Sequence, residues 1–472
     1  MPSIPDDLSI VEHGLPRLPR RPLRVAVLGA GMAGLVATYE LQRAGHEPLL
    51  IEARQRVGGR VETLRAPFAE GLHAEAGVMA IPATHRLTLG YVRAFGIPLK
   101  PFPISNPDAY YYVGGRRLRI REAEADPRSA GLAAGQSDES VSQLWKTTLA
   151  PLVRQIGRDG EAAWAELSRL YDRCSLREFL ASHGWTEEGI ELFGILLNQE
   201  ALLDTSALEL LREELSGCYV DTACIEGGME RLPRAFLPHL AGALRLHTRV
   251  VAIEQSNSGV TVTCETLGQR LQVAADYAIV TLPFPTLRFV DLGNAVSQAK
   301  RRAVRQLHYD TASKVFLQFS GRFWETEDGI FGGASLTDLP IRKVYYPRSE
   351  GDNQRGVLLA SFTWGDDARS WGALPEGERL ELALRYLTRI HPQAGALAEG
   401  GACKCWHADR YAAGAFALHY PGQHTLLQEA TARPEGRIHF AGEHTSLSHG
   451  WIEGAVSSAL RAVSQIHFAA GR

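Results

Sequence analysis

Hydrophobic positions near the start of the chain change from a strand pattern to a helical pattern and back. A mostly aliphatic run at residues 23–28 predicts a buried strand, and residues 47–52 predict a second one. Residues 35–44 between them are typical of a helix, which Gly45 would end. Together these elements predict a β-α-β unit of about 30 residues.

The middle of the chain follows a helical period. Over residues 141–216, apolar residues recur at helical spacings, as Leu176, Phe179 and Leu180 illustrate. We therefore expect a helical insertion there. The polar segment 121–140 is expected to be a surface loop, and residues 1–21 an extended arm.

Strand patterns return after Gly227-Gly228. Runs at 250–253, 260–262 and 277–280 predict strands, and those at 315–319 and 357–362 predict a second sheet. A last buried strand is expected at 438–441, followed by a helix at about 452–469.

Composition excludes several classes of protein. The 472 residues are 45% hydrophobic and 22% charged, with a net charge of −3, which argues against a general nucleic-acid or membrane-surface binder. The six cysteines form no C-x-x-C pair and are expected to be free thiols in a reducing compartment. With no signal-peptide pattern and no apolar run of about 18 residues, we expect a cytoplasmic protein without a membrane span.

A glycine motif stands between the first strand and the helix. In Gly29-Ala30-Gly31-Met32-Ala33-Gly34, Gly29 permits a tight turn, Gly31 lets a pyrophosphate approach the backbone, and Gly34 allows close helix–strand packing. Glu52, at the end of the second strand, would accept hydrogen bonds from a ribose. A second glycine pair, in Arg56-Val57-Gly58-Gly59-Arg60, suits another approach to phosphate and favours FAD over NAD.

These motifs resemble the flavin amine oxidase superfamily, and most of all its L-amino-acid oxidase branch, over nearly the whole chain. The other matching segments are residues 77–82, 227–233, 281–283, 337–340, 365–368, 440–445 and 449–455.

The resemblance implies an α/β and α+β fold in three parts. A Rossmann-like FAD-binding domain would comprise residues 22–80, 223–295 and 431–472, and a mixed-sheet substrate domain 81–120 and 296–430. Residues 121–222 would be the helical insertion, and 1–21 the N-terminal arm.

The resemblance also implies non-covalent FAD, since the cysteine that some relatives place near the C-terminal flavin segment has no counterpart after Cys405. The implied FAD-binding residues are Gly29, Gly31, Met32, Ala33, Gly34, Glu52, Ala53, Arg54, Gly59, Arg60, Val78, Met79, Val250, Gly442, Glu443, Trp451 and Ile452.

Two residues resemble the catalytic pair of the family. Lys314 matches a lysine that holds a water near flavin N5, and Trp451 matches an aromatic residue that flanks the substrate amine, with Gly450 in the same wall. The alternative for Lys314 is an edge-strand lysine that points outward. The segment with Glu443, His444 and His449 lacks H-E-x-x-H spacing, and no metal is expected.

The substrate pocket departs from the amino-acid oxidase pattern. Ala80 stands where relatives have an arginine, and Phe362 where they have a tyrosine; both of those residues bind the substrate carboxylate. A carboxylate buried without its partner loses about 3–5 kcal/mol, or roughly two to three orders of magnitude in affinity. Phe362 and Phe416 would instead form an apolar, aromatic pocket, unless they are ordinary core residues.

Arg212 is the candidate replacement for the missing cation, with Arg86 a weaker one. The alternative for Arg212 is a solvated charge beside Glu213 and Glu214.

The resemblance implies an oxidase that transfers a hydride from the amine Cα to flavin N5. The imine hydrolyses to a carbonyl compound and ammonia, and O₂ reoxidises the flavin to give hydrogen peroxide. The expected substrate is an apolar or aromatic amine, or an amino-acid derivative, without a free carboxylate. The alternatives are an L-amino-acid oxidase with a relocated cation, a non-catalytic or redox-sensing FAD protein, and a decarboxylating monooxygenase. The oligomeric state stays open, with a homodimer as one option.

Overall fold

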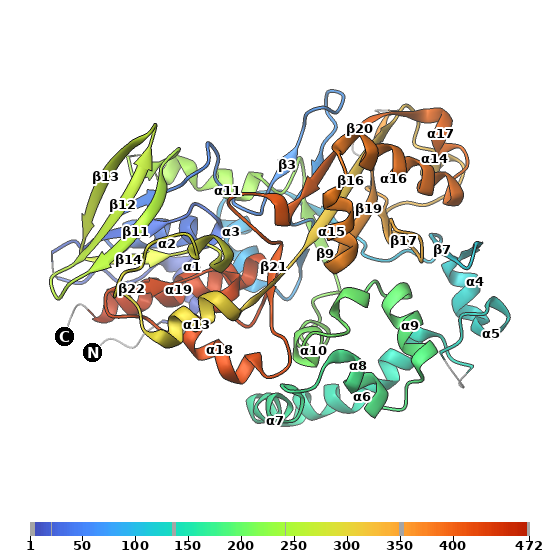
Figure 1. Ribbon diagram of the computed structural model, residues 1–472, viewed down its shortest axis with the longest axis horizontal. Coiled ribbons are helices and arrows are strands. Elements are labelled where there is room, and N and C mark those ends of the chain that lie inside the picture. Colours follow the sequence, from blue (N-terminus) through green and yellow to red (C-terminus); the bar gives the residue numbers. More distant parts are fainter. Residues whose placement is uncertain (1–4, 20, 135–137, 241, 349–353, 470–472) are drawn as a thin grey trace.

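The computed structural model describes residues 5–19, 21–134, 138–240, 242–348 and 354–469. Figure 1 shows three groups of elements: a sheet with long helices against it, a second sheet with its own helices, and a set of helices below both. The α/β and α+β fold class expected from the sequence is confirmed.

The first sheet has five parallel strands in the order β10-β2-β1-β14-β22. Their bounds are β1 Arg24–Leu28, β2 Glu47–Ile51, β10 Leu244–Arg245, β14 Tyr277–Val280 and β22 Ile438–Phe440. The strands therefore come from three separated stretches of chain. The β-α-β unit is β1, helix α2 (Met32–Arg43) and β2, and it is confirmed.

Both faces of this sheet are buried, as is usual for parallel strands. Val25 and Val27 of β1 pack in a core cluster with α2 and with α19 (Ile452–Ala469). Ala26 and Leu28, which point the other way, pack against a three-stranded antiparallel sheet. That sheet consists of β11 (Arg249–Gln255), β12 (Val260–Thr266) and β13 (Gln269–Ala275).

The second sheet has seven strands in the order β20-β16-β19-β18-β17-β7-β8. It is mixed, because β17 and β7 pair in parallel and the other strands pair antiparallel. Helix α16 (Glu376–Ile390) packs with the core on one face of the sheet. The bounds are β7 Tyr110–Val113, β8 Arg116–Arg119, β16 Ala312–Phe319, β17 Ala334–Thr337, β18 Lys343–Tyr345, β19 Gly356–Trp364 and β20 Ala398–Cys405.

A bulge in β19 decides which residues face away from α16. Lys314 of β16 pairs with Phe362, whereas Phe316 pairs with Leu359, so β19 carries one extra residue between these pairs. Opposed residues of antiparallel strands share a face, and the bulge therefore brings Phe362 to the same face as Lys314.

The helical insertion is confirmed and has a core of its own. It contains α6 (Val141–Asp159), α7 (Glu161–Tyr171), α8 (Leu176–Ser182), α9 (Glu187–Leu196) and α10 (Ala207–Leu215). Leu176, Phe179 and Leu180, which gave the helical period, are fully buried in it.

Two smaller elements complete the frame of the cavity described below. A three-stranded sheet has the order β5-β9-β6, with β5 at Ile81–Pro82, β6 at Leu99–Pro101 and β9 at Thr222–Ile225. A two-stranded ribbon pairs β15 (His308–Asp310) with β21 (Phe416–Leu418).

Two segments differ from the expectation of irregular structure. The expected extended arm contains helix α1 (Asp7–His13), because Asp6 caps its first turn and Ile10 and Val11 are buried. The expected loop at 121–140 contains α4 (Ile120–Ala125) and α5 (Pro127–Ala130), and its residues 135–137 lie outside the described part. Of the helices that the structure describes, none is both long enough and apolar enough to span a membrane.

Candidate active site and flavin cradle

A cavity of about 800 Å³ lies where the two large sheets and the helical insertion meet. Nearly all of the site residues expected from the sequence line it, although they come from segments far apart in the chain. Those that do not are Gly34, Arg212 and the weaker cation candidate Arg86.

The first glycine motif forms the turn from β1 into α2. Gly29 has φ +104°, which favours glycine, and a Cβ at Gly34 would lie 1.8 Å from the Gly29 carbonyl oxygen. A Cβ at Gly31 would meet no atom of the described residues within 4 Å, so this position is open to the cavity. As the N-cap of α2, Gly31 offers no side-chain acceptor, which leaves the first N–H groups of the helix available to an anion.

Glu52 is held rigidly on the cavity wall. Its Oε2 accepts a hydrogen bond from the Ala30 N–H (2.7 Å), and its Oε1 accepts one from the Arg54 N–H (2.8 Å). Burial raises the pKa of Glu52, and these two donors oppose that shift. Arg54 in turn pairs with Asp409, a residue that the sequence did not single out.

The second glycine pair lies directly beside the first motif. Gly58 and Gly59 have φ values of +98° and +58°, and Gly31 forms a β-bridge with Gly58. A Cβ at Gly59 would come within 3.2 Å of the Gly31 Cα, so this approach also requires glycine. Two glycine turns that meet at an open helix N-terminus fit the pyrophosphate of FAD.

Arg60 and Glu443 form an ion pair on the cavity wall, in which Glu443 is buried and Arg60 is partly buried. Their Nη1 and Oε1 atoms are 2.8 Å apart. Glu443 Oε2 accepts hydrogen bonds from the Gly450 N–H (3.0 Å) and the Ala417 N–H (3.2 Å). Burial opposes ionisation of Glu443. The charge of Arg60, together with His444, His449 and the Gly450 N–H, outweighs burial, and the pKa falls to about 2. The pair therefore joins three segments of the cavity wall.

Lys314 points into the cavity and not outward from an edge strand. Its side chain is buried, and Nζ donates hydrogen bonds to the carbonyl oxygens of Glu75 (3.0 Å) and Gly77 (2.6 Å). Burial lowers the pKa of Lys314 to about 7, which the charge of Glu75 partly opposes. An ammonium has three donors, so one remains for a water or a ligand.

One wall of the cavity is aromatic. Phe362 packs edge-to-face on Trp364, with ring centroids 5.4 Å apart, and Trp364 packs likewise on Phe416 at 5.5 Å. Ala80 and Gly450 line the same cavity. Trp364 was not anticipated from the sequence.

Trp451 is held by side chains from two other elements. Its Nε1–H donates to Oε1 of Glu213 on α10 (2.8 Å), and His85 packs edge-on against its ring at 5.0 Å. The hydroxyl of Tyr219 donates to the other oxygen of Glu213. Burial raises the pKa of Glu213 to about 7, while these two donors oppose the shift. Glu213 and Tyr219 both line the cavity.

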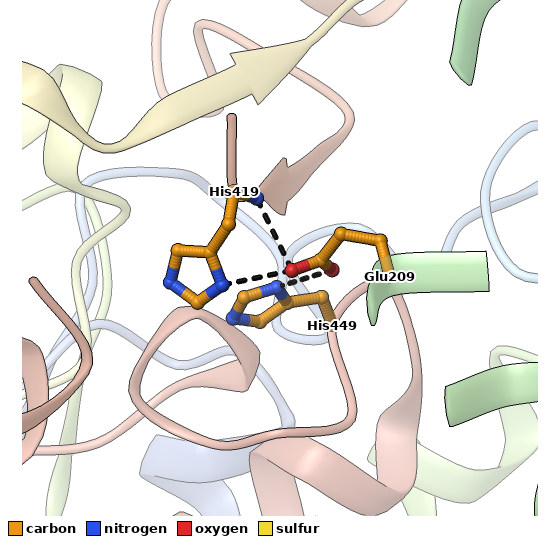
Figure 2. A group of neighbouring side chains, drawn as sticks. All are labelled: Glu209, His419 and His449. Atoms are coloured by element: carbon orange, nitrogen blue, oxygen red, sulfur yellow. Dashed lines mark hydrogen bonds and ion pairs between the residues drawn. The ribbon is translucent and has the colours of Figure 1, made fainter. Parts of the chain in front are cut away.

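One helical turn earlier, Glu209 joins α10 to two further segments (Figure 2). Its carboxylate accepts hydrogen bonds from Nδ1 of His419 (2.8 Å) and Nδ1 of His449 (2.9 Å). Burial opposes a charged imidazole at His449, but Glu209 raises its pKa. The three side chains are close enough to be metal ligands, and the hydrogen bonds account for the arrangement without one.

Arg212 fits neither prediction made from the sequence, which were a cation in the substrate pocket and a solvated charge on the helix surface. Its side chain is only 12% exposed, so it is not a solvated charge. It does not line the cavity but lies 3.9 Å from Glu209 and 3.2 Å from His424. Lys343, which was not anticipated, does line the cavity, with its ammonium 4.7 Å from the Tyr345 ring centroid.

Sequence reasoning missed the two carboxylates of α10. Glu209 and Glu213 are four residues apart on a helix, and a spacing of one turn beside the apolar stripe of Leu208 and Leu211 was the available signal. The run of charges at 212–214 instead suggested a solvated face.

With this geometry, the fold and the site together define a flavin-dependent oxidoreductase. Residues 32–467 match the family of flavin-containing amine oxidoreductases, and the chain belongs to that family. It is an amine or amino-acid oxidase whose cofactor is FAD.

Similar proteins cover nearly the whole length of the chain. YobN of Bacillus subtilis (strain 168) is 37% identical over 474 residues, which is 98% of each chain. An L-amino-acid oxidase of Siganus canaliculatus is 37% identical over 470 residues, covering 98% of this chain and 88% of its own.

Solved structures show the same fold at lower identity. A putrescine oxidase variant, A394C, superposes with a TM-score of 0.78 at 22% identity, covering 94% of this chain and 99% of its own. Cyclohexylamine oxidase from Brevibacterium oxydans IH-35A gives 0.76 at 21% identity, covering 96% and 100%.

Proposed function

We propose that this enzyme oxidises apolar or aromatic amines, or amino-acid derivatives, that carry no free carboxylate. The two glycine turns, Glu52 and the Arg60–Glu443 pair would hold FAD non-covalently. The flavin would supply the two-electron oxidation, with hydride transfer from the amine Cα to N5 and reoxidation by O₂ to give hydrogen peroxide. The imine would hydrolyse to a carbonyl compound and ammonia.

The residues of the chain would bind and orient the reactants. Trp451 and the aromatic wall would hold the amine by its faces, and Lys314 would hold a water near the reacting atoms. The free cysteine thiols support a reducing, cytoplasmic setting.

The observation that carries this proposal is the character of the aromatic wall. Ala80 and Phe362 line the cavity and offer a carboxylate neither charge nor hydrogen bond. Phe362 is fixed by Trp364 and lies beneath the Lys314 ammonium at 4.9 Å, so it is part of the cavity surface and not a distant core residue.

The test compares three substrates that share the same side chain: a free amino acid, its ester and its decarboxylated amine. Anaerobic bleaching of the flavin measures the reductive step, and peroxide release measures turnover. We expect the ester and the amine to exceed the acid by roughly 100-fold or more in kcat/KM. An acid that exceeds both by tenfold would overturn the preference, and an amide product would indicate a monooxygenase.

An L-amino-acid oxidase with a relocated cation is the second candidate, and Lys343 is the observation that favours it. Among the described residues, Lys343 has no ion-pair partner, and it lines the cavity on the strand next to that of Phe362. In that case Lys343→Gln would reduce activity on the acid at least tenfold and spare the ester. Under the main proposal, Lys343→Gln should have the same small effect on activity with the acid and with the ester.

A further inference from the structure

Glu213 differs from Glu443 and Glu209, two other carboxylates of the cavity, in its partners. Glu443 is paired with Arg60, and Glu209 lies between two imidazoles. The two donors to Glu213 are neutral, the indole N–H of Trp451 and the hydroxyl of Tyr219. Within the described ranges, no cation forms an ion pair with Glu213.

A buried carboxylate without a counter-charge is costly, and a ligand cation would relieve the cost. Each oxygen of Glu213 accepts one hydrogen bond and keeps capacity for another. The carboxylate also lines the cavity beside Trp451. A group with N–H donors and a positive charge would meet both requirements, as an ammonium does.

We propose that Glu213 receives the ammonium group of the substrate and takes one of its protons, so that the amine stands neutral beside Trp451. An N–H bond breaks, an O–H bond forms on the carboxylate, and no electrons are transferred. The proton leaves to solvent through the cavity after product release. This inference rests on the proposed amine oxidase function.

The same carboxylate would repel an acidic substrate. Its charge acts together with Ala80 and Phe362, because the charge repels a carboxylate and neither of those two side chains offers it a partner. Selection of amines over amino acids would therefore depend on repulsion as well as on the missing contacts.

Several ionisable groups face Glu213 and shape its titration. They are Glu209 and Glu214 on its own helix, and Cys218 and Tyr219 on the following segment. Farther away, His449 bonds to Glu209, and Lys314 lines the same cavity.

The pH dependence follows from the protonation state of the acceptor. Below about pH 7 Glu213 carries its own proton and cannot accept another. Flavin reduction by the amine should therefore rise with pH through about 7. In a variant without this proton acceptor, the substrate must bind in its deprotonated form. The increase in the rate of flavin reduction should then move toward the amine's own pKa of about 10.

The test uses the FAD-loaded enzyme and the variants Glu213→Gln and Glu214→Gln. Glutamine keeps an oxygen that can accept from Trp451, and Glu214 is an adjacent carboxylate that does not line the cavity. Anaerobic stopped-flow reduction by benzylamine is measured from pH 6 to 10. We expect Glu213→Gln to lose about 10²- to 10³-fold at pH 7 and to recover near pH 10. Glu214→Gln should keep the rise at or somewhat below pH 7, because it removes only a neighbouring like charge.

A second readout does not depend on activity. Benzyltrimethylammonium carries the positive charge but has no proton to give, and calorimetry measures its binding. We expect Glu213→Gln to bind it at least tenfold more weakly than the wild type does. Equal affinities, or a pH profile identical to that of the wild type, would overturn the inference.

A variant that keeps the carboxylate serves as a second test in case Glu213→Gln does not fold. Glu213→Asp should keep the rise near pH 7 with a lower maximum, and a rise near pH 10 in this variant would contradict the role. If no amine bleaches the wild-type flavin, the proposed function itself fails. If amines bleach it but Glu213→Gln leaves the pH profile unchanged, only the role of Glu213 fails.

Discussion

Single residues decide both where charge is neutralised in the cavity and where it is not. Glu443 is the clearest neutralised case, because Arg60 and two backbone N–H groups hold its carboxylate. The net result is a pKa of about 2, below the ordinary value of 4.5.

The depressed pKa of Glu443 predicts a pH effect on stability. The ionised group contributes stability that is fully present above about pH 4.5 and is lost as pH falls through about 2. The shift corresponds to about 3 kcal/mol. Glu443→Gln should therefore reduce the free energy of unfolding by about 3–5 kcal/mol at pH 7, since it leaves the Arg60 charge without a partner. Denaturant titration at pH 7 and pH 3 measures this, and an equal loss at both values would contradict the assignment.

The aromatic wall gives a second prediction at the residue scale. If the loss of two polar partners sets the substrate preference, restoring them should reverse it. Ala80→Arg combined with Phe362→Tyr should raise the ratio of acid to ester activity by at least tenfold. Phe416→Tyr adds the same hydroxyl elsewhere in the cavity and is the control. A ratio that moves equally in both proteins would show a general effect of polarity.

At the scale of elements, the turn from β1 into α2 contains one glycine that the fold requires and another that ligand binding requires. Gly34 is needed by the protein itself, because its missing Cβ makes room for the Gly29 carbonyl. Gly31 faces open space and has φ −72°, which any residue can adopt. Two glycines of one motif thus serve different purposes.

The two glycines predict opposite outcomes for the same substitution. Gly34→Ala should destabilise the fold by several kcal/mol, since the new methyl group overlaps backbone. Gly31→Ala should leave the apoprotein folded while lowering FAD affinity at least tenfold, because the methyl group occupies the space for phosphate. Thermal unfolding of the apoproteins and FAD titration separate the two effects. If Gly31→Ala destabilised the apoprotein as much as Gly34→Ala does, this division would be contradicted.

Elements also show how far the sequence could be interpreted. The β-α-β unit, the helical insertion and the strands β16 and β19 follow from local patterns. The strands are mostly apolar runs buried on both faces, and the insertion has apolar residues at helical spacing. Helix α1 was missed because seven residues give little periodic signal, and only its Asp6 cap and two buried residues reveal it. The bulge that aims Phe362 at the cavity arises from strand pairing, which no local pattern displays.

The site was predictable to the extent that its motifs are contiguous. The glycine turns and the segment around Trp451 could be assigned to the cavity from short matches. Glu209, Glu213 and Lys343 are single residues that tertiary structure brings to the cavity, and none lies in a contiguous motif. Arg212 shows the converse, because a cation on the correct helix turned toward Glu209 and His424 instead.

At the scale of the whole molecule, most of the cavity lining comes from the parts of the chain that form the two large sheets. The helical insertion contributes only a few of the lining residues. Those residues are Leu197, Asn198, Gln199, Leu202, Glu209, Glu213 and Tyr219. Most of the insertion's core, including α6 and α8, packs away from the cavity. FAD should therefore tie the two sheets together more than it stabilises the insertion.

Hydrogen exchange of the protein with and without FAD checks this expectation. A ligand that binds only the native state stabilises it by about 2.7 kcal/mol at a concentration of 100 times its Kd. Removing FAD should increase exchange at residues 29–34, 58–60 and 442–452, where the cavity wall depends on the ligand. The helices α6 and α8 should keep their protection, because Phe179 and Leu180 are fully buried and do not line the cavity. Equal loss of protection in the insertion would mean that the three parts unfold as one cooperative unit, with α10 transmitting the loss through Glu209 and Glu213.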